Sequence, residues 1–242
     1  MPPRRVARLT AATVNRDGVR AVTLSRTSSP DAGTGAGAVL EAIKKLDNVS
    51  STLSELVREA RACTRCAAHL PLGPRPVFQI DARATILVAA QAPGTKVHAS
   101  GRPFTDPSGD RLRAWMGIDE ATFYDPQHLA IIPMGLCYPG RGSGGDLPPR
   151  PECAPAWRQR LLAQLPNIRL TLVIGQYARD WHLPETRRLT LTETVSRYAE
   201  FAPACIPLPH PSPRNNRWLK KNPWFERDVV PVLAQRVADA MS

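Results

Sequence analysis

Short apolar runs alternate with amphipathic stretches along most of the chain. Four of these runs have the nearly continuous apolar character of strands that are buried on both faces of a sheet. They lie at residues 85–90, 129–134, 170–175 and 204–208. Helix-like segments separate or follow them, at residues 108–117, 152–165, 175–182 and 223–240. This alternation predicts an α/β fold: a three-layer α/β/α sandwich with a mostly parallel four-stranded central sheet.

The first 37 residues lack this alternation. They are rich in Arg, Thr and Ser, and they end in a run of small and polar residues at 28–37. We expect a disordered basic N-terminal tail over residues 1–37 and one folded domain over residues 38–242. Within residues 38–66, apolar side chains recur at three- and four-residue steps, which predicts two helices, the second capped by Asn48 or Ser50.

The chain is strongly basic. Its formal net charge is +11 at pH 7, from 32 Lys and Arg against 21 Asp and Glu, and the part after residue 47 is still basic. This charge favours a polyanionic partner, nucleic acid above all, with a basic surface kept for solubility as the alternative. The tail is then a basic arm, an organelle presequence or a solvated segment.

The apolar pattern also argues against a membrane partner. No stretch approaches the roughly 18 consecutive apolar residues that a membrane helix needs. No apolar run follows Arg4 and Arg5, so we expect no secretion signal and a cytoplasmic protein.

Four of the five cysteines have the spacing of metal ligands. Cys63 and Cys66 form a CxxC pair, and Cys137 and Cys153 are separated by fifteen residues. A CxxC turn lets two thiolates reach one metal centre, and two distant cysteines close the site; a zinc ribbon would show a second CxxC. Four unliganded cysteines are the alternative. We expect Cys205 to be a small buried apolar residue.

Two sequence motifs lie where predicted strands end. The run 85–90 leads into Gln91-Ala92-Pro93-Gly94, followed by Gly101-Arg102-Pro103-Phe104. The run 204–208 leads into His210-Pro211-Ser212-Pro213-Arg214-Asn215. Ligands of open α/β sheets bind beyond the carboxyl ends of the strands, so both motifs are expected on one rim.

Together these motifs resemble the uracil-DNA glycosylase superfamily. QAPG followed by GRPF is similar to the first motif of its iron–sulfur family, which has GEAPG and then GRPF. HPSPRN at 210–215 is similar to the second motif of the single-strand-selective monofunctional branch. The cysteine spacing resembles the ligand set of the iron–sulfur family, and the resemblance covers about residues 55–240.

Three positions depart from the pattern of that iron–sulfur family. Gln91 replaces a Glu, and Pro133 replaces an Asn that would contact the polar edge of uracil. His98 stands where an acidic residue is often found, four positions after Gly94.

The resemblance implies a monofunctional uracil-DNA glycosylase, a hydrolase that rotates uracil or a related deaminated base out of DNA and cuts its N-glycosidic bond. A non-catalytic relative that binds uracil-containing or abasic DNA is the alternative, kept open by Gln91 and Pro133. The resemblance also implies a monomer with a structural [4Fe–4S] cluster, which would anchor a Pro- and Gly-rich loop at 138–151 facing DNA. The predicted cluster ligands are Cys63, Cys66, Cys137 and Cys153.

The implied site residues fall into two groups. Phe104 would stack on the base, with core packing as the alternative. His210 would donate a hydrogen bond to the departing base, and His98 would position the water or contact a phosphate. The remaining predicted substrate-binding residues are Gln91, Ala92, Pro93, Gly94 and Ser212. Asp106 and Asp110 would support the sugar cation or cap a helix.

The second group would bind DNA, with Trp218 or Leu219 as a wedge in the stack. Its predicted members are Arg214, Asn215, Arg217, Trp218 and Lys220.

Overall fold

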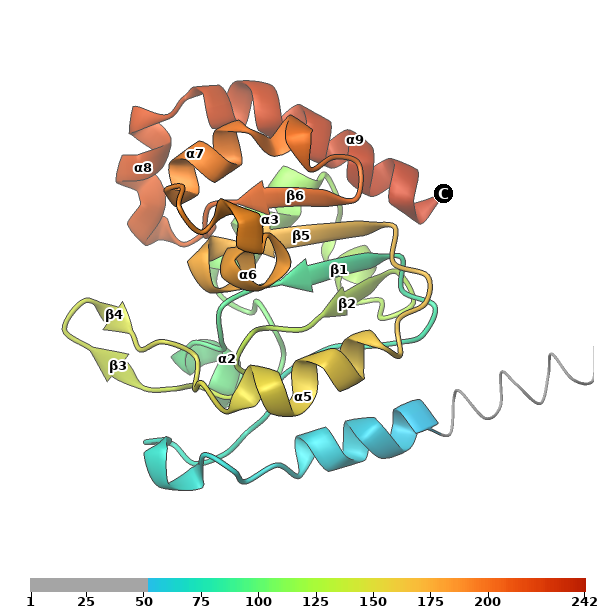
Figure 1. Ribbon diagram of the computed structural model, residues 1–242, viewed down its shortest axis with the longest axis vertical. Coiled ribbons are helices and arrows are strands. Elements are labelled where there is room, and N and C mark those ends of the chain that lie inside the picture. Colours follow the sequence, from blue (N-terminus) through green and yellow to red (C-terminus); the bar gives the residue numbers. More distant parts are fainter. Residues whose placement is uncertain (1–51) are drawn as a thin grey trace, which may run out of the picture. The chain divides into compact units, whose positions relative to one another are not determined.

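A computed structural model of the protein describes residues 52–242 (Figure 1). The predicted tail at 1–37, its boundary with the folded domain, and the first of the two predicted N-terminal helices lie outside these residues. Residues 52–61 are helical, as the apolar spacing predicts.

The four predicted strands form one parallel sheet. They are β1 (Ile86–Ala89), β2 (Leu129–Ile131), β5 (Leu170–Ile174) and β6 (Cys205–Leu208). Their order across the sheet is β2-β1-β5-β6, and each neighbouring pair is parallel. Val88 pairs with Ile131 on one side and with Leu172 on the other, so β1 and β5 occupy the centre. All four carboxyl ends therefore meet at one edge, as the sequence predicts.

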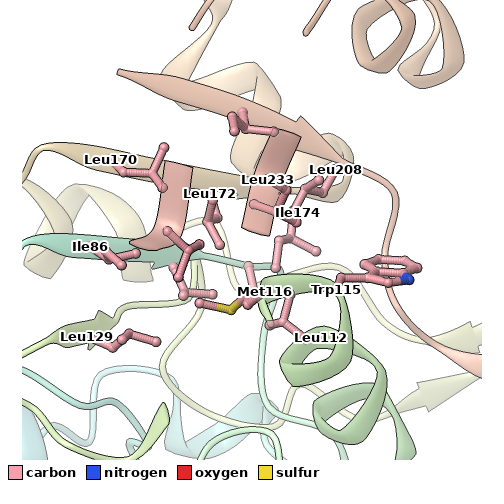
Figure 2. Close-up of a cluster of buried hydrophobic side chains, with 14 of the residues drawn as sticks. Ile86, Leu112, Trp115, Met116, Leu129, Leu170, Leu172, Ile174, Leu208 and Leu233 are labelled. Atoms are coloured by element: carbon pink, nitrogen blue, oxygen red, sulfur yellow. The ribbon is translucent and has the colours of Figure 1, made fainter. Parts of the chain in front are cut away.

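One face of the sheet is covered by α3 (Pro107–Met116) and α9 (Val230–Met241). Every second strand residue, such as Ile86 and Leu172, points to this side because successive side chains of a strand alternate between faces. Figure 2 shows Leu112 and Met116 of α3 and Leu233 of α9 packed against them. This cluster is the largest apolar core of the described chain.

The opposite face is covered by the helix at 52–61, by α5 (Cys153–Leu162) and by α6 (Gly175–His182). Leu87 packs in a cluster with Leu56 and Trp157, while Val173 packs with Ala178 of α6. Helices thus lie on both faces of the sheet, and the fold is the predicted three-layer α/β/α sandwich.

Several short elements go beyond the prediction. The additional α-helices are α2 (Thr95–Ser100), α4 (Glu120–Phe123), α7 (Leu191–Ser196) and α8 (Asn216–Lys221). Strands β3 (Arg141–Gly142) and β4 (Gly145–Asp146) form an antiparallel hairpin. The 3-10 turns are η1 (Ala67–His69), η2 (Pro184–Thr186), η3 (Tyr198–Glu200) and η4 (Pro213–Asn215), and η5 (Phe225–Val229) is a π-helical turn leading into α9. None of the helices in residues 52–242 has the length and apolar character of a membrane span.

Candidate functional site

A cavity of about 290 Å³ opens at the carboxyl edge of the sheet. Its walls come from the loops that follow β1, β2 and β6, from the N-terminal end of α3, and from the β3–β4 hairpin. Among the residues predicted to act on the substrate, those lining it are Ala92, Pro93, Gly94, Phe104, His210 and Ser212. The two sequence motifs therefore meet at one cavity, close in size to the smaller ligand pockets of proteins.

Phe104 is held as one wall of this cavity by its backbone. Its φ is +55°, in the left-handed region that a bulky residue adopts only when its surroundings enforce it. The hydroxyl of Tyr124 donates to the carbonyl oxygens of Pro103 (2.8 Å) and Phe104 (3.1 Å). The side chain is 9% exposed and also belongs to the main core cluster, where its ring meets Phe123 edge to face, with 6.0 Å between centroids. The aromatic wall is thus held in position by its neighbours.

Gly109 of α3 makes this backbone conformation possible. A Cβ built on Gly109 would lie 1.8 Å from the carbonyl oxygen of Phe104, so no larger residue fits without moving that loop. Asp106 caps the same helix, since its carboxylate accepts from the backbone N–H groups of Ser108 (3.2 Å) and Gly109 (3.3 Å). The start of α3 and the Phe104 loop are therefore one interlocked unit.

His210 presents a single ring N–H donor. The backbone N–H of Ser212 donates to Nδ1 (3.2 Å), so Nδ1 acts as acceptor and the proton of the neutral ring lies on Nε2. Desolvation lowers the pKa of His210 below its ordinary value, and the charges of Asp106 and Asp146 only partly oppose that shift. The Asn215 side-chain amide donates to the His210 carbonyl oxygen (2.7 Å) and fixes the loop. His210 is thus a neutral hydrogen-bond donor at neutral pH.

Gln91 does not line the cavity, although Ala92, Pro93 and Gly94 do. Its side-chain amide donates instead to the Leu147 carbonyl oxygen (3.4 Å), and its own carbonyl oxygen accepts from the backbone N–H of Gly135 (2.9 Å). Gln91 therefore holds the β1 loop against the segments after β2 and β4. The predicted contact of its side chain with the substrate has no support in this arrangement.

His98 also lies away from the cavity. Residues 95–100 form α2, and Thr95, Lys96 and Val97 take the positions that line the cavity. The His98 ring faces Tyr138 instead, with 6.2 Å between centroids, and within residues 52–242 its buried Nδ1 has no hydrogen-bond partner. His98 is the fourth residue of α2, and the helical turn directs its ring away from the cavity.

The basic segment after His210 divides into exposed and structural residues. Arg214, Arg217 and Lys220 are exposed, and Arg214 also lines the cavity. Asn215 is engaged with the His210 loop, so its side chain serves the site rather than an external ligand. The Ser212 hydroxyl accepts from the backbone N–H of Arg214 (3.3 Å) and caps η4.

Trp218 and Leu219 belong to the core rather than to a DNA-facing wedge. The Trp218 ring packs against Trp224 and Phe225, and its Nε1–H donates to the Thr192 hydroxyl (2.8 Å). Leu219 is 9% exposed and lies in the main core cluster. Trp218 is half-buried and packs against the π-helical turn η5, while Leu219 of the same helix is buried in the core.

Two charged residues of the β3–β4 hairpin were missed by sequence reasoning. Arg141 and Asp146 line the cavity from opposite strands of that hairpin. The glycines at 142, 144 and 145 are the signal for the turn, but nothing in the spacing indicates where the turn folds. Of the two carboxylates that we expected nearby, Asp106 lines the cavity, whereas Asp110 pairs with Arg113 (2.6 Å).

The four spaced cysteines line a second cavity together. It lies between the segment after the helix at 52–61, the loop after β2, and the start of α5. Cys63 Sγ accepts from the Trp157 indole N–H (3.2 Å), and Cys153 Sγ accepts from the Leu136 backbone N–H (3.2 Å). Burial raises the pKa of Cys137 to about 12 and that of Cys153 to about 11. Over the described chain, no group of three or more His, Cys, Asp or Glu side chains has the geometry to hold one metal ion.

Cys205 lies apart from these four, at the start of β6, where it packs beside Val173 and Ala178. Burial raises its pKa to about 11. This environment fits the expected role of a small apolar residue.

A family model described as "Uracil DNA glycosylase superfamily" matches residues 77–234, about two thirds of the chain. The matched segment contains the whole sheet, both motifs and every residue that lines the cavity.

Proposed function

This chain belongs to the uracil DNA glycosylase superfamily, and we propose that it hydrolyses the N-glycosidic bond of uracil or a related deaminated base during base-excision repair of DNA. The single observation that carries this proposal is the cavity shared by Phe104 and His210. A base inside a duplex cannot be reached at its sugar bond, so the enzyme must rotate it into a pocket. A pocket of this kind needs an aromatic face and a donor for the departing base.

Binding of the extruded base is assigned to the fixed aromatic wall. A base stacks on an aromatic ring with about 1–3 kcal/mol of stabilisation. Phe104 lines the cavity with a side chain that is mostly buried, and Tyr124 and Gly109 hold its backbone in place. The Ala92–Gly94 backbone supplies polar groups along the neighbouring wall.

His210 is assigned to the departing base. As the glycosidic bond breaks, negative charge develops on the base, and a fixed donor aimed at that charge contributes a factor of about 10²–10³ to the rate. The neutral ring with its proton on Nε2 suits this task, because Ser212 already occupies Nδ1.

DNA affinity is assigned to the exposed cations around the cavity mouth. Arg141 and Arg214 line the cavity, while Arg217 and Lys220 continue the basic surface along α8. Contacts of this kind bind phosphates without reading sequence. A monomer as the active form is part of the proposal.

Base preference is where we expect this chain to differ from the iron–sulfur family that its motifs resemble. Pro133 lines the cavity at the position where the similar iron–sulfur family has Asn. A proline side chain makes no hydrogen bond, so polar contacts to the base must come from backbone groups or from other polar side chains that line the cavity, such as Ser108 and Ser212. We therefore include hypoxanthine and xanthine among the substrates to be tested beside uracil.

A structural [4Fe–4S] cluster on Cys63, Cys66, Cys137 and Cys153 is part of the proposal. The donor set suits such a group: four thiols face one cavity, and two of them already accept N–H hydrogen bonds, which tune cluster sulfurs. A single zinc needs its ligand sulfurs about 2.3 Å from one point, whereas in a cubane each thiolate binds a different iron, so the sulfurs stand further apart. The cluster would tie the loop after β2 to α5 and leave hydrolysis to other residues.

The cluster is tested by its composition. Anaerobically purified protein should be brown and contain iron and sulfide, and Cys137→Ser should lose both. Cys205→Ser is the matched control and should keep both, because that thiol lies elsewhere. A colourless, iron-free protein with full activity would rule the cluster out.

The activity itself is tested on oligonucleotides that carry a single uracil, hypoxanthine or xanthine. We expect alkali-sensitive strand breaks with at least one of them and their loss in His210→Ala. Tight binding to uracil-containing DNA without any breaks would instead identify a non-catalytic DNA-binding relative.

A further inference from the structure

The proposed hydrolysis needs a group that accepts a proton from the attacking water. His210 is unsuited to this, because its Nδ1 is occupied by Ser212 and its Nε2 carries a proton. His98 faces Tyr138. In the described part of the chain, the carboxylates that line the cavity are Asp106 and Asp146.

Asp106 is committed to the start of α3. One carboxylate oxygen accepts from two backbone N–H groups, and the other lies 3.4 Å from the Ser108 hydroxyl. Both carboxylate oxygens of Asp106 are therefore already engaged as acceptors. Moving Asp106 toward a water would also break the helix cap that supports Phe104.

Asp146 has no such commitment. Within residues 52–242 its carboxylate makes no hydrogen bond and no ion pair, although Arg141 faces it across the hairpin. A Cβ built on Gly94 would lie 3.4 Å from Asp146 Oδ2, so this oxygen stands directly beside the backbone of the β1 loop. Its charge also acts on His210 across the cavity.

The hairpin that carries Asp146 is held in place at the cavity. The Leu147 backbone N–H donates to the Gly140 carbonyl oxygen (2.9 Å) and closes the hairpin base. The Arg214 guanidinium lies against Gly145 so closely that a Cβ there would overlap it. Arg214 thus joins the His210 loop to the hairpin, and Asp146 is positioned by both.

We propose, on the basis of the function proposed above, that Asp146 is the catalytic residue that activates the attacking water. As the bond from C1′ to the base nitrogen breaks, its electron pair leaves with the base, and His210 stabilises the charge. The water oxygen bonds to C1′ while the Asp146 carboxylate takes the proton that the water loses. The proton then passes to solvent or to the base anion, which leaves a free base and an abasic site.

Asp146→Asn tests this role because it keeps the size of the side chain and removes the proton acceptor. We expect the single-turnover excision rate on a single-uracil oligonucleotide to fall about 10²- to 10⁴-fold, the usual contribution of a general base. Affinity should be unchanged or tighter for an oligonucleotide with the non-hydrolysable analogue 2′-fluoro-2′-deoxyuridine, because a negative charge near the phosphates is removed. Asp146→Glu should recover part of the rate.

Asp110→Asn is the control, because it likewise neutralises one carboxylate. Asp110 lies on α3 and pairs with Arg113 instead of lining the cavity. This variant should excise at the wild-type rate. An Asp146→Asn rate within threefold of wild type would overturn the assignment, as would a joint loss of rate, affinity and melting temperature. A wild-type protein inactive on all three bases would overturn the proposed function itself, and the role of Asp146 with it.

Discussion

Replacing Gly109 with Ala should disable the cavity while leaving the fold intact. In an ordinary helix this change is favourable by about 1 kcal/mol, because Ala is the better helix former. Here the new Cβ would lie 1.8 Å from the Phe104 carbonyl oxygen and 3.0 Å from the Phe104 Cβ. Moving the new Cβ and the Phe104 carbonyl oxygen apart to about 3.0 Å requires a shift of about 1.2 Å. That separation is still shorter than the optimal distance between two heavy atoms.

That shift falls on the residue that forms the aromatic wall. A misplacement of about 1 Å costs roughly 10²-fold in rate when it disturbs the position of the substrate. Overpacking costs about 1–3 kcal/mol, and the helix gain offsets about 1 kcal/mol of it, so the net loss of stability is small. We therefore expect Gly109→Ala to excise uracil about 10²-fold more slowly at saturating enzyme, with DNA affinity preserved.

The assay is single-turnover release of the base, with urea unfolding measured on the same preparations. Gly144→Ala is the matched control, because no atom lies within 4 Å of a Cβ built there and its backbone is not in the left-handed region. It should excise at close to the wild-type rate. A Gly109→Ala enzyme that is both more stable and fully active would refute the reasoning, because the Phe104 loop would then be free to move.

Three further predictions follow from the same structure. Burial lowers the pKa of His210 below 6.5, and the neutral ring is the donor. As pH falls, kcat/KM should therefore stay constant through pH 6.5 and decline only at lower pH; a decline centred on pH 6.5 would contradict this. Arg158 is 1% exposed, donates to the Ile132 and Pro133 carbonyl oxygens and contacts His182. Arg158→Ala would leave those buried carbonyl oxygens without their donor and open a cavity, so it should lower the free energy of unfolding in urea by about 3 kcal/mol. On the same helix, Arg160→Ala breaks an exposed ion pair and should cost less than about 1 kcal/mol; equal losses would argue against the buried role. Arg217→Ala should weaken DNA binding equally for all bases and reduce the slope of log Kd against log salt concentration by about one. Weaker binding of DNA with one particular base would instead indicate direct contact between Arg217 and that base.

The sheet was predictable because its strands carry their own signal. The run 170–175 is apolar at nearly every position, as required of a strand covered by helices on both faces. The convergence of Phe104 and His210 followed from that sheet, since parallel strands bring their carboxyl ends to one edge. Both residues line the cavity, although they are distant in the sequence.

The errors arose where a role was assigned from the number of residues after a motif or from the residue type alone. His98 was placed by its distance from Gly94, but a helix begins at Thr95 and turns residue 98 away. Trp218 was assigned to DNA because of its basic neighbours, yet the fold uses its ring to cover Phe225. A single sequence does not distinguish an aromatic residue that covers the core from one that faces a ligand.

Asp146 illustrates a different limit. Strands of two residues have no periodicity, so the β3–β4 hairpin leaves no pattern beyond its glycines. Its approach to Gly94 and Arg214 is a tertiary contact between segments that are far apart in the chain. Such contacts become visible only when the loops are placed together in space.

The central claim, that one cavity takes up an extruded base between Phe104 and His210, is tested most directly by a crystal structure of His210→Ala with DNA carrying a single uracil. The account predicts the uridine rotated out of the helix, its base against the Phe104 ring and its glycosidic bond facing residue 210. A uracil that stays stacked in the DNA, or that binds elsewhere on the protein, would contradict it.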